Sequence, residues 1–304
     1  MSSSGDDDGD LAGGQRIERD GVRIHFVRSG PRGATPLVVL HGLSANAQYF
    51  TGLLRAGLDE RHDVIRVDLR GRGQSDAPEG EGRYSMQAHG EDVLAVMDAA
   101  GLDDAVLVGH SFGGLVTVWL AARHPSRIRR QVLADISGPT IQNPEIVRLL
   151  YPLLDRLDRE FPSFERYLDF IRGLPFLAGV WTDELLEYLR ADVADLPSGA
   201  VRPRTPRRVI DQCLQLGARE DWAGLIAQAR APALALHAPG AFGPAGAPPL
   251  VLRAQADDLV ACLPDARLAS VPGNHMTMMF GPGARAVVAA IDAFLSASGP
   301  PGSA

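Results

Sequence analysis

Gly109-His110-Ser111-Phe112-Gly113 follows the apolar run Ala105 to Val108 and opens a second apolar run that extends to Ala122. This pattern predicts a buried strand, a sharp turn and then a helix. A serine at such a turn adopts a strained backbone conformation that exposes its hydroxyl group. The helix start beside it favours negative charge. We therefore interpret Ser111 as a candidate nucleophile, with a plain strand–helix turn as the alternative.

The overall composition is that of a soluble globular protein. Of the 304 residues, 45% are hydrophobic and 22% are charged, which is enough for a large core. The net charge of −7 offers no general basic surface for nucleic acid. No run of about 18 apolar residues predicts a membrane span, and Met1 to Gly5 does not resemble a signal peptide. We expect a cytoplasmic protein that binds neither nucleic acid nor membranes.

The absence of lysine excludes several classes of enzyme. The chain has 30 Lys+Arg residues, and all of them are arginine. This excludes a P-loop, a pyridoxal phosphate enzyme and an S-x-x-K hydrolase, each of which needs a lysine. No C-x-x-C or H-E-x-x-H spacing occurs, so we expect neither a metal nor another cofactor. Cys213 and Cys262 could form a disulfide, but we expect two free thiols.

Strand patterns alternate with helix patterns along most of the chain. The alternation predicts an α/β fold with a mostly parallel sheet and helices on both faces. Ligands bind outside the carboxyl ends of the strands in such sheets, and Ser111 follows one of these ends. The predicted strands are residues 16–20, 22–28, 37–40, 63–69, 105–108, 131–136, 233–237 and 266–271. Further helices are predicted from Met86 to Ala100 and near 251–261 and 284–295.

The pattern changes between Gly138 and about Glu220. No alternating strand is evident there, and helical stretches rich in aromatic residues are interrupted by prolines. We predict a helical cap of residues 139–220 inserted into a core of residues 15–138 and 221–296. Residues 1–14, which include an acidic run, and residues 297–304 are expected to be a disordered leader and tail.

A serine hydroxyl needs a base, and His275 is the best candidate. It follows the last predicted strand, so its loop reaches the same sheet edge as Ser111. A surface or packing histidine is the alternative. A carboxylate should orient the imidazole, and the first place to look is the segment after the strand at 233–237. That segment, Ala238 to Pro244, contains no acid.

Asp135 is the favoured third residue. It ends the strand that follows the Ser111 helix, two strands away from the histidine loop. Neighbouring strands are about 4.8 Å apart, so the loop can reach it. Asp257 or Asp258, both in a predicted helix, are alternatives, as is a site without an acid. Read as structure alone, Asp135 is a turn residue at a strand end.

Two backbone amides could bind the oxyanion that forms when a serine attacks a carbonyl group. One belongs to Phe112, and the other to Leu43, which follows the strand at 37–40. His41-Gly42 can also be an ordinary turn. We expect an apolar substrate pocket, although most apolar residues belong to the core. The pocket residues that we predict are His41, Met276, Met279 and Trp181.

The chain resembles the α/β-hydrolase superfamily, in the cap-bearing branch that includes esterases, lactonases, haloperoxidase-like enzymes and carbon–carbon bond hydrolases. The resemblance covers about residues 16 to 296, and the matching motifs are His41-Gly42-Leu43, Asp68 to Asp76, Gly109 to Gly114, and Asn274-His275. The resemblance implies the α/β-hydrolase fold, Ser111 as nucleophile, His275 as base, and the Leu43 and Phe112 amides as the oxyanion hole. It implies a structural role for the segment Asp68 to Asp76. A minority of the superfamily carries the acid one strand earlier than usual, which supports Asp135.

We therefore expect a serine hydrolase that cleaves an ester, lactone or thioester of a mostly apolar small molecule through an acyl-enzyme. Epoxide hydrolases and haloalkane dehalogenases carry aspartate at the position of Ser111, so those activities are disfavoured. Carbon–carbon cleavage, cyclisation or acyl transfer at the same site is an alternative, as is a non-catalytic ligand-binding protein. The basic segment 201–208 could guide a carboxylate or an acyl carrier, although a solvated loop is favoured.

Overall fold

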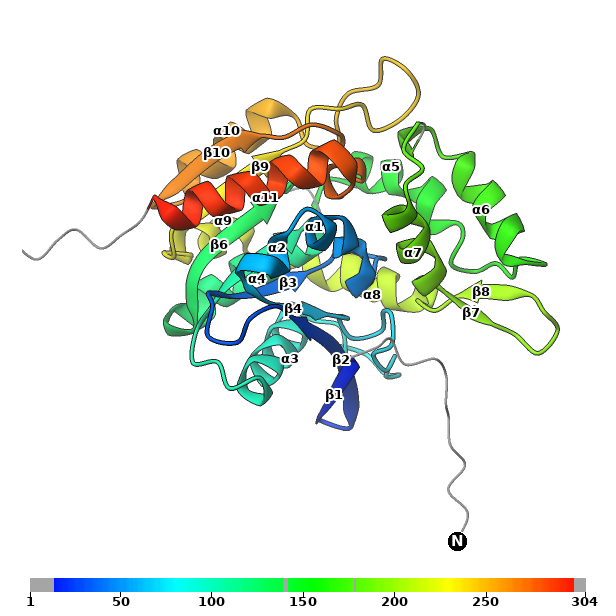
Figure 1. The fold of residues 1–304 in the computed structure, drawn as a ribbon, viewed down its shortest axis with the longest axis horizontal. Helices are drawn as coiled ribbons and strands as arrows, with labels where there is room; N and C mark the ends of the chain where they lie inside the picture. Colours follow the sequence, from blue (N-terminus) through cyan, green and yellow to red (C-terminus); the bar gives the residue numbers. More distant parts are fainter. Residues whose placement is uncertain (1–13, 139–141, 178, 298–304) are drawn as a thin grey trace, which may run out of the picture.

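The computed structural model describes residues 14–138, 142–177 and 179–297. The predicted leader and tail therefore lie almost wholly outside the described residues. Eight strands form one sheet in the order β1-β2-β4-β3-β5-β6-β9-β10 (Figure 1). β2 pairs antiparallel with β1 and β4, and all other neighbours are parallel. The predicted α/β fold with a mostly parallel sheet is confirmed.

The strands of this sheet occupy most of the predicted positions. They are β1 (Gly14–Arg19), β2 (Val22–Ser29), β3 (Pro36–Leu40), β4 (Asp63–Val67), β5 (Ala105–His110), β6 (Ile128–Ala134), β9 (Ala233–His237) and β10 (Ala266–Ser270). β6 ends at Ala134, one residue before Asp135, whereas the prediction extended it to Ile136. This difference leaves Asp135 in the loop that leaves the sheet.

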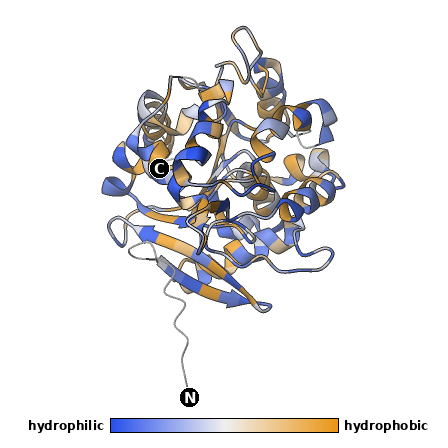
Figure 2. Cartoon of the chain, turned by 90° about the vertical axis from the view of Figure 1, so that its right-hand side faces the viewer, coloured by the Kyte–Doolittle hydropathy of each residue, from blue (hydrophilic) through white to orange (hydrophobic). Residues whose placement is uncertain are grey.

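Helices cover both faces of the sheet. Along β3, Leu37 and Val39 belong to one hydrophobic cluster, and Val38 and Leu40 belong to the other. The first cluster includes residues of α1 (Thr51–Arg55) and α11 (Gly281–Ser296), and the second includes residues of α3 (Met86–Ala99) and α4 (Phe112–Arg123). Figure 2 shows hydrophobic and hydrophilic residues on the same helices, as expected for helices with one face against the sheet.

The helices of the core include several that the sequence did not predict. α1, α2 (Leu58–Arg61) and α9 (Trp222–Gln228) are short, so they have too few turns to show a clear hydrophobic period in the sequence. The predicted helix after Ser85 is present, and the Ser85 side chain accepts a hydrogen bond from the Ala88 amide. The core helices are α1 (Thr51–Arg55), α2 (Leu58–Arg61), α3 (Met86–Ala99), α4 (Phe112–Arg123), α9 (Trp222–Gln228), α10 (Arg253–Cys262) and α11 (Gly281–Ser296), with short 3-10 turns η1 (Ala47–Phe50), η2 (Pro125–Arg127) and η5 (Thr277–Met279).

The segment between β6 and α9 carries helices and a small ribbon beside the sheet (Figure 1). Its elements are α5 (Pro144–Leu154), α6 (Phe164–Arg172), η4 (Pro175–Leu177), α7 (Asp183–Ala191), β7 (Val193–Asp195), β8 (Val201–Pro203) and α8 (Arg207–Gly217). The antiparallel ribbon β7-β8 departs from the expectation of helices alone. Strands of three residues are too short to give an alternating pattern that sequence reading could detect.

A buried arginine, Arg156, connects the segment between β6 and α9 to the core, and its ion pair with Asp192 lies within that segment. Arg156 Nε donates to the Asp192 carboxylate over 2.9 Å, and Arg156 Nη2 donates to Ser44 O over 2.8 Å. Tyr167 Oη also donates to Asp192, at 2.6 Å. Because Ser44 follows the predicted oxyanion residue Leu43, the hydrogen bond from Arg156 to Ser44 O connects this segment to the candidate site.

Both cysteines are free, with Cys213 buried and Cys262 exposed. Within residues 14–138, 142–177 and 179–297, no helix is both long and apolar enough to cross a membrane. The same part of the chain contains no group of three or more His, Cys, Asp or Glu side chains arranged to hold a metal ion.

Candidate active site

Ser111 lies at the sharp turn between β5 and α4. Its backbone has φ 53° and ψ −119°, a conformation that residues other than glycine rarely adopt. Two glycines make the turn feasible. A Cβ at Gly109 would lie 2.3 Å from Gly113 O, and a Cβ at Gly113 would lie 2.1 Å from Leu40 O. The close approach of strand and helix therefore fixes where the Ser111 hydroxyl points.

Ser111, His275 and Asp135 form a continuous hydrogen-bonded chain. His275 Nε2 is 3.0 Å from Ser111 Oγ, and His275 Nδ1 is 2.8 Å from Asp135 Oδ2. A carboxylate can only accept here, so Nδ1 carries the proton and Nε2 presents its lone pair to the serine. The arrangement can move a proton from Ser111 to His275 while Asp135 stabilises the resulting imidazolium.

Asp135 is held in place by the neighbouring strand. Its other oxygen, Oδ1, accepts a hydrogen bond of 2.9 Å from the amide of Ala238, the first residue after β9. Its own amide donates to Leu236 O over 2.7 Å, and its backbone has a positive φ of 50°. Asp135 thus leans across β9 to reach the loop after β10. The other acids considered, Asp257 and Asp258, are exposed on α10.

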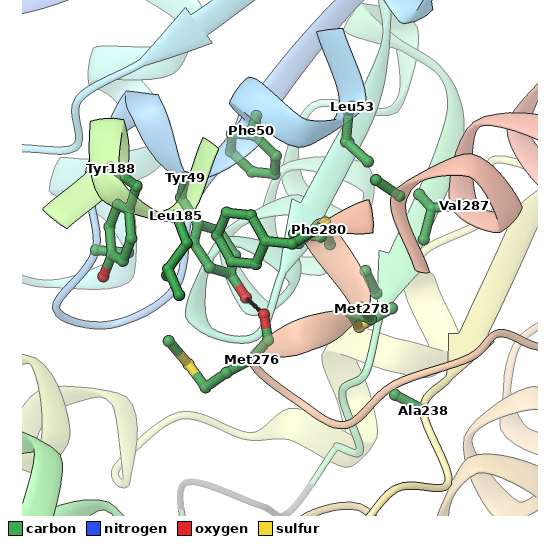
Figure 3. Packing of buried hydrophobic residues seen from close by; sticks show 14 of the residues in the cluster. Tyr49, Phe50, Leu53, Leu185, Tyr188, Ala238, Met276, Met278, Phe280 and Val287 are labelled. Atoms are coloured by element: carbon green, nitrogen blue, oxygen red, sulfur yellow. Dashed lines mark hydrogen bonds between the residues drawn. The ribbon is translucent and has the colours of Figure 1, made fainter. Parts of the chain in front are cut away.

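The loop that carries His275 is anchored on several sides. Asn274 donates to Phe176 O and Ala241 O, and its oxygen accepts from the amides of Met276 and Thr277. The Tyr49 hydroxyl donates to Met276 O over 2.8 Å, as Figure 3 shows. His110 Nε2 also donates to His275 O, at 2.8 Å. These bonds hold the backbone of the loop around His275 in place, and the sequence analysis did not identify Asn274 or Tyr49 as supports.

The two predicted oxyanion amides flank Ser111. Phe112 N is the first amide of α4, where helix amides have no acceptor within the helix. The Leu43 amide has no hydrogen-bond acceptor among the residues that the structure describes. The peptide plane before Leu43 is fixed because Gly42 O accepts from the Ala45 amide and from His41 Nδ1. Both amides are thus available to a ligand.

A mostly apolar cavity opens beside Ser111 and His275. Its volume, taken as the space open to the centre of a water molecule, is about 50 Å³. Apart from the polar site residues, its lining consists mainly of aliphatic and aromatic side chains. The lining residues are Leu43, Ser111, Phe112, Leu115, Asp135, Ile136, Ser137, Ile146, Val147, Leu150, Leu214, Leu250 and His275.

Three of the four predicted pocket residues lie elsewhere. Met276 lines a second cavity that also touches Ser111 and His275. His41 is wholly buried, and both of its ring nitrogens are used within the fold: Nε2 accepts from the Leu69 amide and Nδ1 donates to Gly42 O. Burial lowers the pKa of His41 to about 4. Met279 is wholly buried in the hydrophobic core, and Trp181 stacks on Arg172 of the cap. His41, Met279 and Trp181 are therefore not among the residues that line the two cavities beside Ser111.

Comparison with known proteins decides the family. The family profile described as the alpha/beta hydrolase fold matches residues 35–282. The chain belongs to this family. Among solved structures, E-2-(acetamidomethylene)succinate hydrolase has a TM-score of 0.79 and 21% identity, covering 93% of this chain and 98% of that one. An enol-lactonase from Burkholderia xenovorans LB400 has a TM-score of 0.69 and 22% identity, covering 93% and 100%.

Curated relatives of this α/β-hydrolase match over shorter stretches. Epoxide hydrolase 4 from Mus musculus is 31% identical over 133 residues, which are 44% of this chain and 37% of that protein. 2-Hydroxymuconate semialdehyde hydrolase from Pseudomonas sp. (strain CF600) is 30% identical over 179 residues, which are 57% and 59% of the two chains. The chain thus spans roughly a third to three fifths of the length of these relatives.

The segment between β6 and α9 supplies pocket residues that the sequence analysis did not single out. Ile146, Val147 and Leu150 of α5 and Leu214 of α8 line the cavity beside Ser111. The signal that could have found the α5 residues is their spacing, because positions three and four apart lie on one face of a helix. The spacing does not indicate, however, whether this face of α5 is directed toward Ser111.

Proposed function

We propose that this α/β-hydrolase is a serine hydrolase that cleaves an ester, lactone or thioester of a mostly apolar small molecule. The observation that carries the proposal is the hydrogen-bonded chain from Ser111 through His275 to Asp135, with contacts of 3.0 and 2.8 Å. The two free amides of Leu43 and Phe112 beside it support the same reaction class.

In this mechanism, Ser111 Oγ attacks the substrate carbonyl carbon as His275 Nε2 takes the hydroxyl proton. The tetrahedral oxyanion is bound by the amides of Leu43 and Phe112. His275 then gives its proton to the leaving oxygen or sulfur, and an acyl-enzyme remains. Water, deprotonated by His275, attacks this acyl-enzyme and releases the carboxylic acid and free Ser111.

The cavity supports an apolar acyl or alcohol group as the substrate feature. Apolar side chains such as Phe112, Ile146 and Leu150 dominate the lining around Ser111. They offer no hydrogen bonds to a charged or strongly polar ligand. No cluster of basic side chains appears in the lining that the structure describes. We therefore expect substrates that carry no charge near the scissile bond.

A serine at position 111 does not fit epoxide hydrolysis, the activity for which one relative is named. A carboxylate nucleophile that opens an epoxide or displaces a halide gives an ester, which water can hydrolyse at its carbonyl. A serine that did the same would give an ether, which has no carbonyl for water to attack. Ser111 therefore fits acyl transfer and not alkyl transfer.

The test compares the wild-type protein with Ser111→Ala. The wild type should hydrolyse short p-nitrophenyl esters and react covalently with a fluorophosphonate probe, and the variant should do neither. Mass spectrometry should place the phosphonyl group on Ser111. Equal labelling of the two proteins would exclude Ser111 as the nucleophile, and an inert wild type that binds ligands tightly would favour the non-catalytic alternative.

A second candidate function is hydrolysis of a carbon–carbon bond. The similarity to 2-hydroxymuconate semialdehyde hydrolase, 30% identical over 179 residues, favours it. The same Ser111 and His275 could serve, with His275 protonating a carbon leaving group. Product analysis by mass spectrometry with vinylogous diketone and ester substrates separates the two functions, because only the first substrate class requires cleavage between carbon atoms.

A further inference from the structure

Arg72 is a buried cation without a carboxylate partner. Its side chain is wholly buried, and no carboxylate of the described residues lies within 4.0 Å of its guanidinium. Arg70 and Arg156, which are also buried, each form an ion pair with an aspartate, at 2.6 and 2.9 Å. The positive charge of Arg72 is therefore not cancelled by a direct neighbour, unlike the charges of Arg70 and Arg156.

The hydrogen-bond partners of Arg72 are all neutral acceptors. Nη1 donates to Arg70 O over 2.7 Å and to His89 Nε2 over 2.9 Å, and Nη2 donates to Cys213 Sγ over 3.0 Å. His89 Nδ1 donates to Ser85 O, which leaves Nε2 free to accept. Burial, with the charge of Arg72 second, keeps the pKa of His89 well below 6.5, and burial raises the pKa of the Cys213 thiol.

The remaining contacts of Arg72 are with the two residues whose amides flank Ser111. Its Nε donates to Leu43 O over 2.9 Å, and its Cζ lies 5.2 Å from the centroid of the Phe112 ring. The hydrogen bond fixes the peptide plane that follows Leu43, and the ring contact restrains Phe112. A single guanidinium thus supports both sides of the candidate oxyanion hole.

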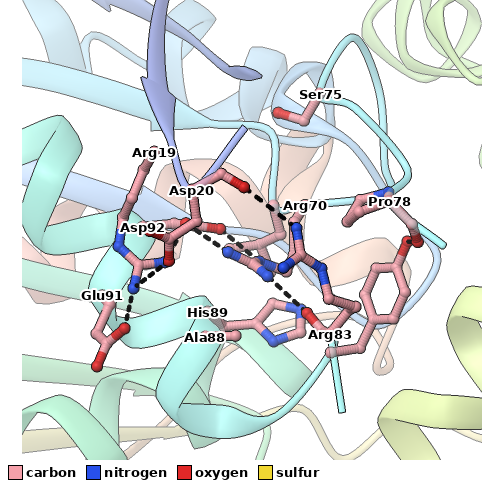
Figure 4. A network of polar contacts seen from close by, with 12 residues as sticks. Arg19, Asp20, Arg70, Ser75, Pro78, Arg83, Ala88, His89, Glu91 and Asp92 are labelled. Atoms are coloured by element: carbon pink, nitrogen blue, oxygen red, sulfur yellow. Dashed lines mark hydrogen bonds and ion pairs between the residues drawn. The ribbon is translucent and has the colours of Figure 1, made fainter. Parts of the chain in front are cut away.

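The loop that carries Arg72 is itself rigidly held. Arg70 makes two hydrogen bonds to Asp92, of 2.6 and 2.7 Å, and donates to Arg83 O. Figure 4 shows this network, in which Arg19 and Glu91 extend the contacts to the surface. Because Arg70 O is one acceptor of Arg72, the network also fixes the position of the Arg72 guanidinium.

We propose that Arg72 is an electrostatic positioning residue that holds the Leu43 and Phe112 amides and adds positive potential where the oxyanion forms. The inference rests on the serine hydrolase function proposed above. In an interior of low dielectric constant, an uncompensated charge acts over several ångströms. Negative charge develops on the substrate oxygen only in the transition state, so Arg72 should favour the transition state over the bound substrate.

The test compares Arg72→Met, which keeps much of the side-chain length without charge, with Arg72→Lys, which keeps the charge without the planar fork. Turnover of a p-nitrophenyl ester gives kcat and KM, and the inhibition constant of a trifluoromethyl ketone reports binding of the tetrahedral state. Circular dichroism and thermal melting show that each variant is folded. Cys213→Ala is the matched control, because it removes one neutral acceptor and leaves the charge.

The neutral variant should lose about 10- to 100-fold in kcat with KM within about threefold of wild type. The ketone should bind less tightly by a factor similar to the loss in kcat/KM. Arg72→Lys should retain at least several times the kcat of Arg72→Met, and Cys213→Ala should stay within about threefold of wild type. If the methionine variant does not fold, Arg72→Gln replaces it as the neutral variant.

Three results would overturn the inference. The first is a folded neutral variant with wild-type kcat and ketone affinity. The second is equal loss in the lysine and neutral variants, which would assign the effect to shape and not to charge. The third is a change in KM alone. If Ser111→Ala abolishes activity in parallel, the proposed function stands while this inference fails; if Ser111→Ala keeps wild-type activity, both fail.

Discussion

Replacing Asp135 by asparagine should nearly abolish activity, for a reason specific to this structure. Asp135 Oδ1 accepts a hydrogen bond from the Ala238 amide, and Oδ2 accepts one from His275 Nδ1. In the variant, the amide oxygen must stay opposite Ala238, because an NH2 group there would face another donor. The NH2 group then faces His275 Nδ1 and donates to it.

This orientation forces the wrong tautomer on His275. Its proton moves to Nε2, which lies 3.0 Å from Ser111 Oγ and can no longer accept the serine proton. The loss of the correct tautomer in a catalytic triad reduces kcat by about 10⁴-fold, which corresponds to about 5 kcal/mol of transition-state stabilisation. The side chain keeps its size and its Ala238 contact, so folding should be little changed.

The measurement is kcat for a p-nitrophenyl ester, together with the rate of fluorophosphonate labelling and the melting temperature. Asp257→Asn is the control. Asp257 is exposed on α10 and pairs with Arg253 at 3.0 Å, so the control should keep activity within about twofold. A folded Asp135→Asn variant with more than a tenth of wild-type kcat would refute the reasoning. So would a loss of several orders of magnitude in Asp257→Asn or Asp258→Asn.

Three further predictions concern stability and the support of the site. Gly113→Ala would place a Cβ 2.1 Å from Leu40 O and should destabilise the fold by about 3 kcal/mol or more, seen as a lower melting temperature. Asn274→Ala should lower kcat about tenfold and reduce stability in denaturant titrations, because it leaves the carbonyls of Phe176 and Ala241 without their donor. Wild-type stability of either variant would contradict the corresponding prediction. Burial lowers the pKa of His41 from 6.5 to about 4, so the unfolded chain binds a proton first as the pH falls. The free energy of unfolding should therefore decrease between pH 6.5 and 4, by about 3 kcal/mol from His41 alone, and constant stability across this range would contradict the burial argument.

The fold and the site's central residues could be predicted because local pattern carries them. The strand–turn–helix around Ser111 is visible in apolar runs bounded by glycines, and the parallel sheet follows from the alternation of strands and helices. The absence of an acid after the strand at 233–237 directed attention to Asp135. In the structure, Asp135 reaches His275 by leaning across β9, as expected for a residue two strands away.

The pocket residues could not be predicted in the same way. His41 and Met279 are close to the site along the chain, but their side chains are buried in the core. Met276 and Leu150, by contrast, line cavities that touch Ser111. The direction of a side chain in a loop depends on the local backbone angles. The sequence periodicities of strands and helices, two and 3.6 residues, say nothing about those angles.

By itself, the sequence determined the sheet, the strand–turn–helix at Ser111 and the chain order of Ser111, Asp135 and His275, because apolar periodicity and turn residues act over a few neighbouring positions. Only the tertiary structure decided which cap residues face Ser111, how Asn274 anchors the histidine loop, and that Arg72 contacts both Leu43 and Phe112. These contacts join segments far apart in the chain, and their geometry is set by how the cap and the loops pack against the sheet.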